Sequence, residues 1–201
     1  MTKEYDRQYF DRWYRGRDRV HTHGEVRRKI MLAVATAEYF LGRPIKTVLD
    51  VGAGEGAWLT HLRPLRRKVS YLGVEPSDYA VEAFGATRNL RKGSFARLAT
   101  LRLGGPFDLV VCSDVLHYLS KREIGEGIGE LARLTGGVAY IEVLTEEDSI
   151  IGDLHGLNRR PAAWYRRRFE RAGFRWVAPY LWLSPALREE ASELEMAEAS
   201  R

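Results

Sequence analysis

The residues best suited to chemistry form a glycine loop that follows an acid. Residues 48–59 read Val-Leu-Asp-Val-Gly-Ala-Gly-Glu-Gly-Ala-Trp-Leu, so an apolar run reaches Asp50 and glycines follow at alternate positions from Gly52. Glycine lacks a Cβ, which permits a sharp turn and a close approach of the backbone to a ligand. Glu75 ends the next apolar run, where an acid can accept hydrogen bonds from both hydroxyls of a ribose. The spacing predicts a site for a nucleoside-containing cofactor.

Alternating strand and helix patterns must position this loop. Ser77 is expected to cap one helix, and Ser120 with Glu123 another. Runs that are apolar almost throughout are typical of parallel strands covered on both faces. We therefore predict an α/β fold, a doubly wound, mostly parallel, Rossmann-like sheet of six to seven strands with helices on both faces. The expected strands are 47–51, 69–75, 89–94, 107–112 and 137–143, and the expected helices are 56–65, 77–86, 120–134 and 161–172.

One domain is expected from the length of 201 residues. We divide it into an N-terminal helical lid or cap (1–44), a Rossmann-like core (45–184) and an acidic C-terminal tail (185–201). Within the cap a helix is expected over 24–42. Near the other end, Pro179 interrupts the segment 174–183, so the seventh strand is expected to be short or absent.

Composition limits the class of protein. The single cysteine excludes a disulfide framework, and no set of metal ligands is expected. No run approaches the roughly 18 apolar residues of a membrane span, and the charged start does not resemble a signal peptide. A cytoplasmic protein, monomeric or homodimeric and without a membrane partner, is expected. Residues 1–47 carry 11 Lys/Arg against 6 Asp/Glu, and residues 148–187 carry 7 against 3. These basic flanks favour an anionic substrate if they fold over the site, whereas the alternative is that they solvate exposed helices.

Three features favour a methyl donor over a nicotinamide cofactor, although Gly52-x-Gly54-x-x-Ala57 also fits a dinucleotide fingerprint. They are the acid two residues before the first glycine, the third glycine Gly56, and the segment Phe107–Leu119. With Glu75 in Leu-Gly-Val-Glu-Pro-Ser, Gly136–Glu142 and Ala172–Phe174, they form an ordered set over residues 45–182. This set resembles the class I S-adenosylmethionine-dependent methyltransferases.

The resemblance implies which residues hold S-adenosylmethionine. The glycines would face its methionine part, Asp50 its ammonium end and Glu75 its ribose. Cys112 and Ser113 would offer backbone carbonyls. Many members carry an acid after the third strand, and here that place reads Lys92-Gly93-Ser94-Phe95. The implied set is Asp50, Gly52, Ala53, Gly54, Glu75, Pro76, Ser94, Phe95, Cys112, Ser113 and Leu116.

Methyl transfer needs a general base only if the acceptor must lose a proton. His117 and His155 are the candidates, because histidine titrates close to neutrality. We expect the acceptor to be a small molecule that is methylated on O or N and can carry a carboxylate or phosphate. Nucleic-acid methylation, a nicotinamide-dependent oxidoreductase and a non-catalytic cofactor-binding protein stay open as alternatives. The expected acceptor-binding residues are Tyr9, Trp13, Tyr14, His117, His155, Arg159, Arg160, Trp164 and Tyr165.

Overall fold

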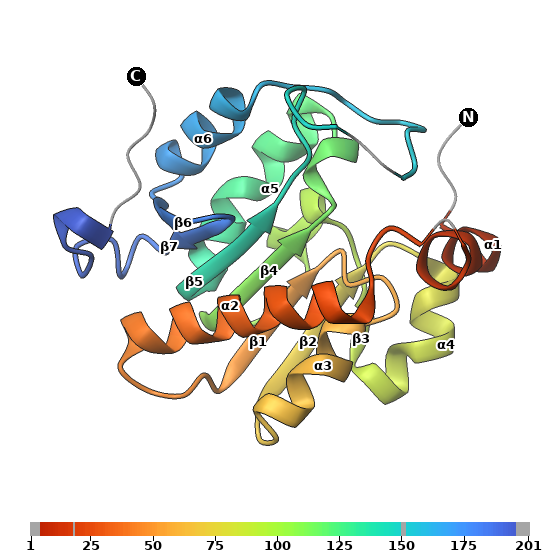
Figure 1. The fold of residues 1–201 in the computed structure, drawn as a ribbon, viewed down its shortest axis with the longest axis horizontal. Coiled ribbons are helices and arrows are strands. Elements are labelled where there is room, and N and C mark those ends of the chain that lie inside the picture. The colour runs from red at the N-terminus through yellow and green to blue at the C-terminus, as the bar shows by residue number, and fades with distance from the viewer. Residues whose placement is uncertain (1–4, 18, 150–151, 196–201) are drawn as a thin grey trace.

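A seven-stranded sheet forms the centre of the molecule (Figure 1). The computed structural model describes residues 5–17, 19–149 and 152–195. Six strands run in the same direction, and one antiparallel strand lies between the fifth strand and the sixth, which forms the sheet edge. The order is β3-β2-β1-β4-β5-β7-β6, and the predicted doubly wound sheet is confirmed. The strands are β1 Thr47–Val51, β2 Ser70–Glu75, β3 Leu90–Lys92, β4 Phe107–Ser113, β5 Thr135–Glu142, β6 Arg175–Ala178 and β7 Leu181–Leu183.

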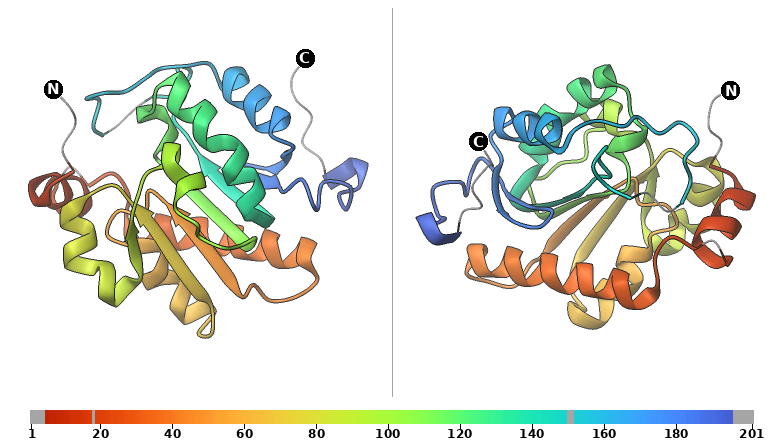
Figure 2. Two further views of the ribbon diagram at one scale, coloured as in Figure 1. Left: turned by 180° about the vertical axis from the view of Figure 1, so that it is seen from behind. Right: turned by 45° about the horizontal axis from the view of Figure 1, so that its top comes forward.

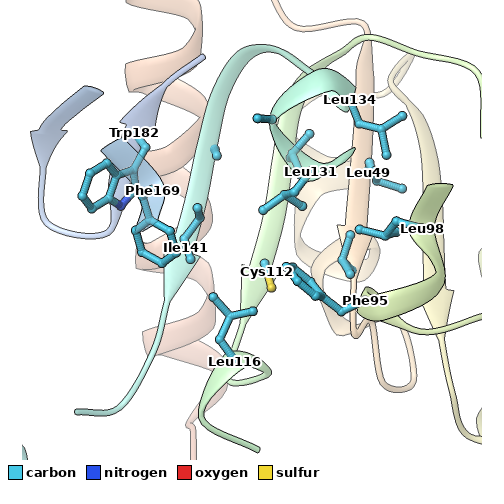
Figure 3. Close-up of a cluster of buried hydrophobic side chains, with 14 of the residues drawn as sticks. Leu49, Phe95, Leu98, Cys112, Leu116, Leu131, Leu134, Ile141, Phe169 and Trp182 are labelled. Carbon is cyan, nitrogen blue, oxygen red and sulfur yellow. The ribbon is translucent and has the colours of Figure 1, made fainter. Parts of the chain in front are cut away.

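Helices cover both faces of this sheet, as the two views of Figure 2 show. One face packs against α2 and α3, and the other against α5 and α6. Side chains along β1 alternate between the two layers, with Val48 on the first face and Leu49 on the second. The second core contains Leu49, Cys112 and Phe169 (Figure 3). The helices are α1 Arg7–Phe10, α2 His23–Leu41, α3 Ala57–Leu65, α4 Asp78–Arg88, α5 Lys121–Leu134 and α6 Ala162–Arg171.

Local sequence signals account for the helix starts. Ser77 accepts a hydrogen bond from the Ala80 amide, and Ser120 with Glu123 forms the expected capping box at α5. A second capping box, Thr22 with Glu25, starts α2 and was missed, which is why that helix begins before the predicted residue 24. These caps place the start of each helix close to the carboxyl end of the sheet.

The two ends of the chain complete the description of the fold, and the seventh strand is short, which is one of the two expected outcomes. The seventh strand is present with three residues, because Pro179 lies in the turn between β6 and β7 rather than inside a strand. At the N-terminus, α1 continues as a π-helix over Asp11–Arg15. Residues 1–4 and 18 of the predicted cap and residues 196–201 of the acidic tail lie outside the described residues. No helix in the described part of the chain is both long and apolar enough to cross a membrane.

Candidate functional site

The glycine loop has the backbone that its sequence predicts. Gly52, Gly54 and Gly56 have φ angles of +78°, +54° and +74°, a region that residues with a Cβ rarely adopt. A Cβ placed on Gly52 would lie 2.2 Å from Val115 Cγ2. The amides of Gly52 and Ala53 both donate to the Val74 carbonyl, at 2.8 and 3.1 Å. The loop therefore bends back over the end of β2 and presents backbone where a side chain would not fit.

Asp50 lies buried below this loop, with 2% of its surface exposed. It pairs with Gly73 of β2 and Val111 of β4, so it occupies the middle of the sheet near the carboxyl ends of the strands. The Tyr71 hydroxyl donates to Asp50 Oδ2 at 2.7 Å. Burial raises the pKa of Asp50 to about 7, and the nearby Glu75 carboxylate adds to this rise, while the Tyr71 hydrogen bond opposes it. A cationic ligand group would restore its ionised form.

Glu75 is a second buried acid, only 4% exposed, at the end of β2. Its Oε2 accepts from the Gly54 amide at 2.7 Å and its Oε1 from the Ser77 amide at 2.9 Å. Burial raises its pKa, although the amides of Ser77 and Gly54 favour the charged form. Glu75 thus links the glycine loop to the start of α4. Each carboxylate oxygen has a second lone pair that can accept from a ligand hydroxyl.

The turn after β3 lies beside Glu75, because the Gly93 amide donates to the Glu75 carbonyl at 3.1 Å. Ser94 precedes a 3-10 helix and is half-buried. Phe95, expected at the adenine, is 2% exposed, and its ring belongs to the core that contains Cys112 (Figure 3). A Cβ on Gly127 of α5 would lie 2.4 Å from that ring. The role predicted for Phe95 can therefore involve its backbone but not its ring.

The end of β4 presents backbone rather than reactive side chains. Cys112 is fully buried and burial raises the pKa of its thiol, so a thiolate nucleophile is not favoured. The Ser113 hydroxyl donates to Glu142 Oε2 at 2.7 Å. Leu116 is buried in the core. Pro76, after Glu75, is exposed. The carbonyl roles of Cys112 and Ser113 stay predictions.

A charged cluster at the ends of β4 and β5 was missed by sequence reasoning. His21 Nε2 lies 2.7 Å from Asp114 Oδ2, and Lys29 Nζ lies 2.8 Å from Glu142 Oε2 and 3.3 Å from His21 Nε2. Burial opposes ionisation of Asp114, but His21 and the Lys29 charge lower its pKa. Candidate ligand atoms of His21, Asp114 and Glu142 lie within 4.8 Å of one another, and the Lys29 ammonium pairs with one of the two carboxylates, that of Glu142. Its members are distant in sequence. The one available signal was that Asp114 and Glu142 lie at the carboxyl ends of two expected parallel strands.

The predicted base and acceptor residues occupy different environments. His117 is 1% exposed; its Nδ1 accepts from the Leu144 amide at 3.2 Å and its carbonyl from the Asn158 amide at 2.7 Å. His155 is exposed on the loop between β5 and α6. Arg159, on the same loop, is exposed and donates to backbone carbonyls.

Tyr165 belongs to the core rather than to the surface of an acceptor pocket, because its side chain is 1% exposed. The Arg160 guanidinium donates to its hydroxyl at 3.0 Å. The loop between β5 and α6 therefore places Arg160 against α6, where it contacts the buried Tyr165.

The N-terminal segment covers the glycine loop. Phe10 is 1% exposed and its ring lies 5.6 Å from that of Tyr79 in α4, so α1 lies beside α4 (Figure 2). Arg15 forms an ion pair with Glu55. A Cβ on Gly54 would lie 2.7 Å from the Tyr14 hydroxyl, so Tyr14 occupies the space directly over that glycine.

The other two predicted aromatic residues of this segment lie apart. The Tyr9 ring lies 5.0 Å from that of Tyr5, whereas Trp13 stacks with the Arg12 guanidinium at 4.5 Å. Trp13 lies within the π-helix, which has more residues per turn than an α-helix. Tyr14, rather than Trp13, reaches the glycine loop.

A protein-family model matches most of the chain. The model of a family described as a methyltransferase domain matches residues 5–181. No curated protein sequence matches significantly. The Streptomyces venezuelae DesVI structure is 19% identical with a TM-score of 0.64, covering 89% of this chain and 98% of its own.

Two further solved structures have the same fold. CalS10, a Micromonospora echinaspora amino pentose methyltransferase solved with S-adenosylmethionine bound, is 17% identical with a TM-score of 0.62, over 83% of this chain and 92% of its own. KedS8, a sugar N-methyltransferase from Streptoalloteichus sp. ATCC 53650, is 19% identical with a TM-score of 0.61, over 87% and 92%. At these identities the likeness establishes the fold.

Proposed function

The chain belongs to the methyltransferase-domain family, and from that premise we propose that it transfers a methyl group from S-adenosylmethionine to an O or N atom of a small molecule. The observation that carries this proposal is the pair of buried acids, Asp50 and Glu75, on either side of a glycine loop that leaves no room for a Cβ. The amino-sugar methyltransferases among proteins of the same fold support a small acceptor.

The residues at this site fit the cofactor by charge and shape. Its sulfonium supplies an electrophilic methyl group, and its methionine end carries an ammonium. Asp50 would bind that ammonium end, and Glu75 would accept from the ribose hydroxyls. Gly52, Ala53 and Gly54 would form the wall against the cofactor, because a glycine backbone has no Cβ and lets a ligand approach closely. Pro76, Ser94 and Phe95 would border the nucleoside, and Cys112, Ser113 and Leu116 the methionine part.

The protein's own contribution to the reaction would be mainly positioning. Tyr14 would cover the reacting groups from the N-terminal segment, which also carries Tyr9 and Trp13. If the acceptor loses a proton, His117 and His155 stay candidates, and the structure adds a third. His21, with Nε2 bonded to Asp114, has the pairing that orients an imidazole as a base.

Binding and activity measurements test this proposal together. We expect S-adenosylhomocysteine to bind by calorimetry, with NAD and NADP showing no binding. Glu75→Gln should weaken binding at least about tenfold, because it loses a charged acceptor. Glu82→Gln, an exposed acid on α4, is the matched control and should leave affinity unchanged. Binding of a nicotinamide nucleotide alone would contradict the proposal.

Methyl transfer from labelled S-adenosylmethionine then separates the remaining readings. We expect label in a small acceptor from a panel of amino sugars, phenols and phosphorylated alcohols. Cofactor binding with no turnover on any acceptor would favour a non-catalytic protein, and label only in bulk tRNA a nucleic-acid methyltransferase. A cytoplasmic location and a monomeric or homodimeric state stay predictions from the sequence.

A further inference from the structure

A cationic cavity lies at the starts of α5 and α6, and none of its lining residues belongs to the glycine loop. Its volume is about 670 Å³, within the range of ligand pockets. The loop between β5 and α6 passes across this edge of the sheet (Figure 1). Four of the eight lining residues are basic and none is acidic. They are Ser120, Lys121, Arg122, Asn158, Arg159, Arg160, Pro161 and Trp164.

Arg160 is the unusual member of this lining because it is buried, with 6% of its surface exposed. Its guanidinium donates to the Tyr165 hydroxyl at 3.0 Å and to the Leu119 carbonyl at 2.7 Å, and it stacks on Trp164. All three partners are uncharged. No carboxylate of the described residues forms an ion pair with it. A buried arginine stays charged, and burial of a charge is costly unless an opposite charge accompanies it.

The surroundings add positive charge rather than removing it. The Trp164 ring, on which Arg160 stacks, also contacts Arg168 of α6, whose guanidinium lies 3.3 Å from the ring centroid. Burial lowers the pKa of Arg168, and so do the charges of Arg171, Arg160 and Arg167, which shows that these cations repel one another. Within the described chain, Arg122 is the one basic lining residue that forms an ion pair with a carboxylate, that of Glu126.

Two acids nearby are occupied elsewhere. Glu123 accepts from the Ser120 amide in the capping box of α5, and Glu147 accepts from the Ala162 amide at the start of α6. Neither carboxylate forms an ion pair with the four basic lining residues in the described structure. The cavity therefore has a surplus of positive charge, with exposed Lys121 and Arg159 at its rim and Arg160 at its base.

We propose that this cavity binds the phosphoryl group of a small-molecule ligand, namely a phosphate or diphosphate ester that is the methyl acceptor. Arginine and lysine both bind phosphate oxygens through charge-assisted hydrogen bonds. The identification of the ligand as the acceptor rests on the proposed function. It is supported by the Asn158 amide, which donates to the His117 carbonyl, and by the bond from Arg160 to Leu119. Both contacts join the cavity to the segment that follows β4.

Inorganic pyrophosphate is the probe, titrated into the whole protein by calorimetry. The double variant Lys121→Gln/Arg159→Gln removes two exposed charges, so its fold should be preserved. We expect its affinity for pyrophosphate to fall at least about tenfold. The control Arg91→Gln/Arg97→Gln removes the same charge from exposed positions at β3 and the following 3-10 helix, and should change affinity less than about twofold. Arg160→Gln, checked for folding by circular dichroism, should behave as the first double variant does.

Two results would overturn the proposal. Equal losses in both double variants would show that pyrophosphate responds only to net charge, and absence of saturable binding to the wild-type protein would remove the site. Bulk tRNA that binds at physiological salt and depends on Lys121 and Arg159, without saturable pyrophosphate binding, would assign the cavity to a nucleic-acid surface instead. S-adenosylhomocysteine affinity, measured on the same samples, should be equal in all variants. If S-adenosylhomocysteine does not bind to the wild-type protein, that result would count against the proposed function and not against the phosphoryl site.

Discussion

Replacing Asp50 with Asn isolates the energetic cost of a buried acid that we assign to the proposed cofactor site. Asparagine has nearly the same shape, and its carbonyl can still accept from the Tyr71 hydroxyl. The pKa of Asp50 rises from 3.8 to about 7 in the folded protein. The folded state therefore holds a proton on Asp50 more tightly than the unfolded chain does, so the contribution of Asp50 to stability is greatest at low pH and falls as pH rises through 7.

The magnitude follows from the pKa difference. Each unit corresponds to about 1.4 kcal/mol, so the ionised Asp50 lowers the free energy of unfolding by about 4 kcal/mol well above pH 7. The part of this cost that develops between pH 5 and pH 8 is about 2–3 kcal/mol. We therefore expect Asp50→Asn to stabilise the cofactor-free protein, by that much more at pH 8 than at pH 5, while weakening cofactor binding.

Urea unfolding of the cofactor-free wild type and variant at the two pH values measures this difference. Asp108→Asn is the control. Burial opposes ionisation of Asp108, but hydrogen bonds from Arg43 lower its pKa. Its contribution is present above its unfolded pKa and is lost only as pH falls through the lower folded pKa, so the cost of Asp108→Asn should be equal at both pH values. A stability gain for Asp50→Asn that does not grow with pH would refute the reasoning.

Three further outcomes are expected. Binding of S-adenosylhomocysteine near pH 7 should release a fraction of a proton from Asp50, seen as a dependence of the calorimetric heat on buffer ionisation enthalpy; no such dependence would separate Asp50 from the ammonium group. Gly52→Ala should lower the melting temperature and abolish cofactor binding, since a positive φ and the contact with Val115 each cost about 1–3 kcal/mol; unchanged affinity would contradict the loop assignment. Thr22→Ala should cost about 1 kcal/mol in urea unfolding through loss of the capping box, whereas Thr87→Ala on exposed α4 should cost less than half of that.

The parts of the fold that depend on neighbouring residues could be predicted from sequence. The glycine loop, the strand-end acid Glu75 and the capping box at Ser120 each specify a local backbone, and the structure has all three. Strand and helix ranges followed from apolar runs bounded by such signals. The sequence left open whether the seventh strand is short or absent, because Pro179 indicates a break in the chain. The structure has a short β7, and Pro179 lies in the turn between two antiparallel strands.

The remaining parts depend on contacts between distant residues. His21 meets Asp114 across 93 positions of sequence and Lys29 meets Glu142 across 113, so no local pattern could pair them. Phe95 was assigned by its place after a strand, but burial against α5 decided where its ring lies. The topology of the fold brings such residues together, and the periodicity of residues within one helix or strand does not predict contacts between different elements.

The contact of Tyr14 with the glycine loop has a kinetic consequence. Arg15 pairs with Glu55, and the Ser77 hydroxyl donates to the Tyr5 carbonyl, so the N-terminal segment is attached on both sides of Gly54. A ligand that lies on that glycine can enter or leave only when the segment opens. The dwell time of spent cofactor would then depend on how fast residues 5–17 open.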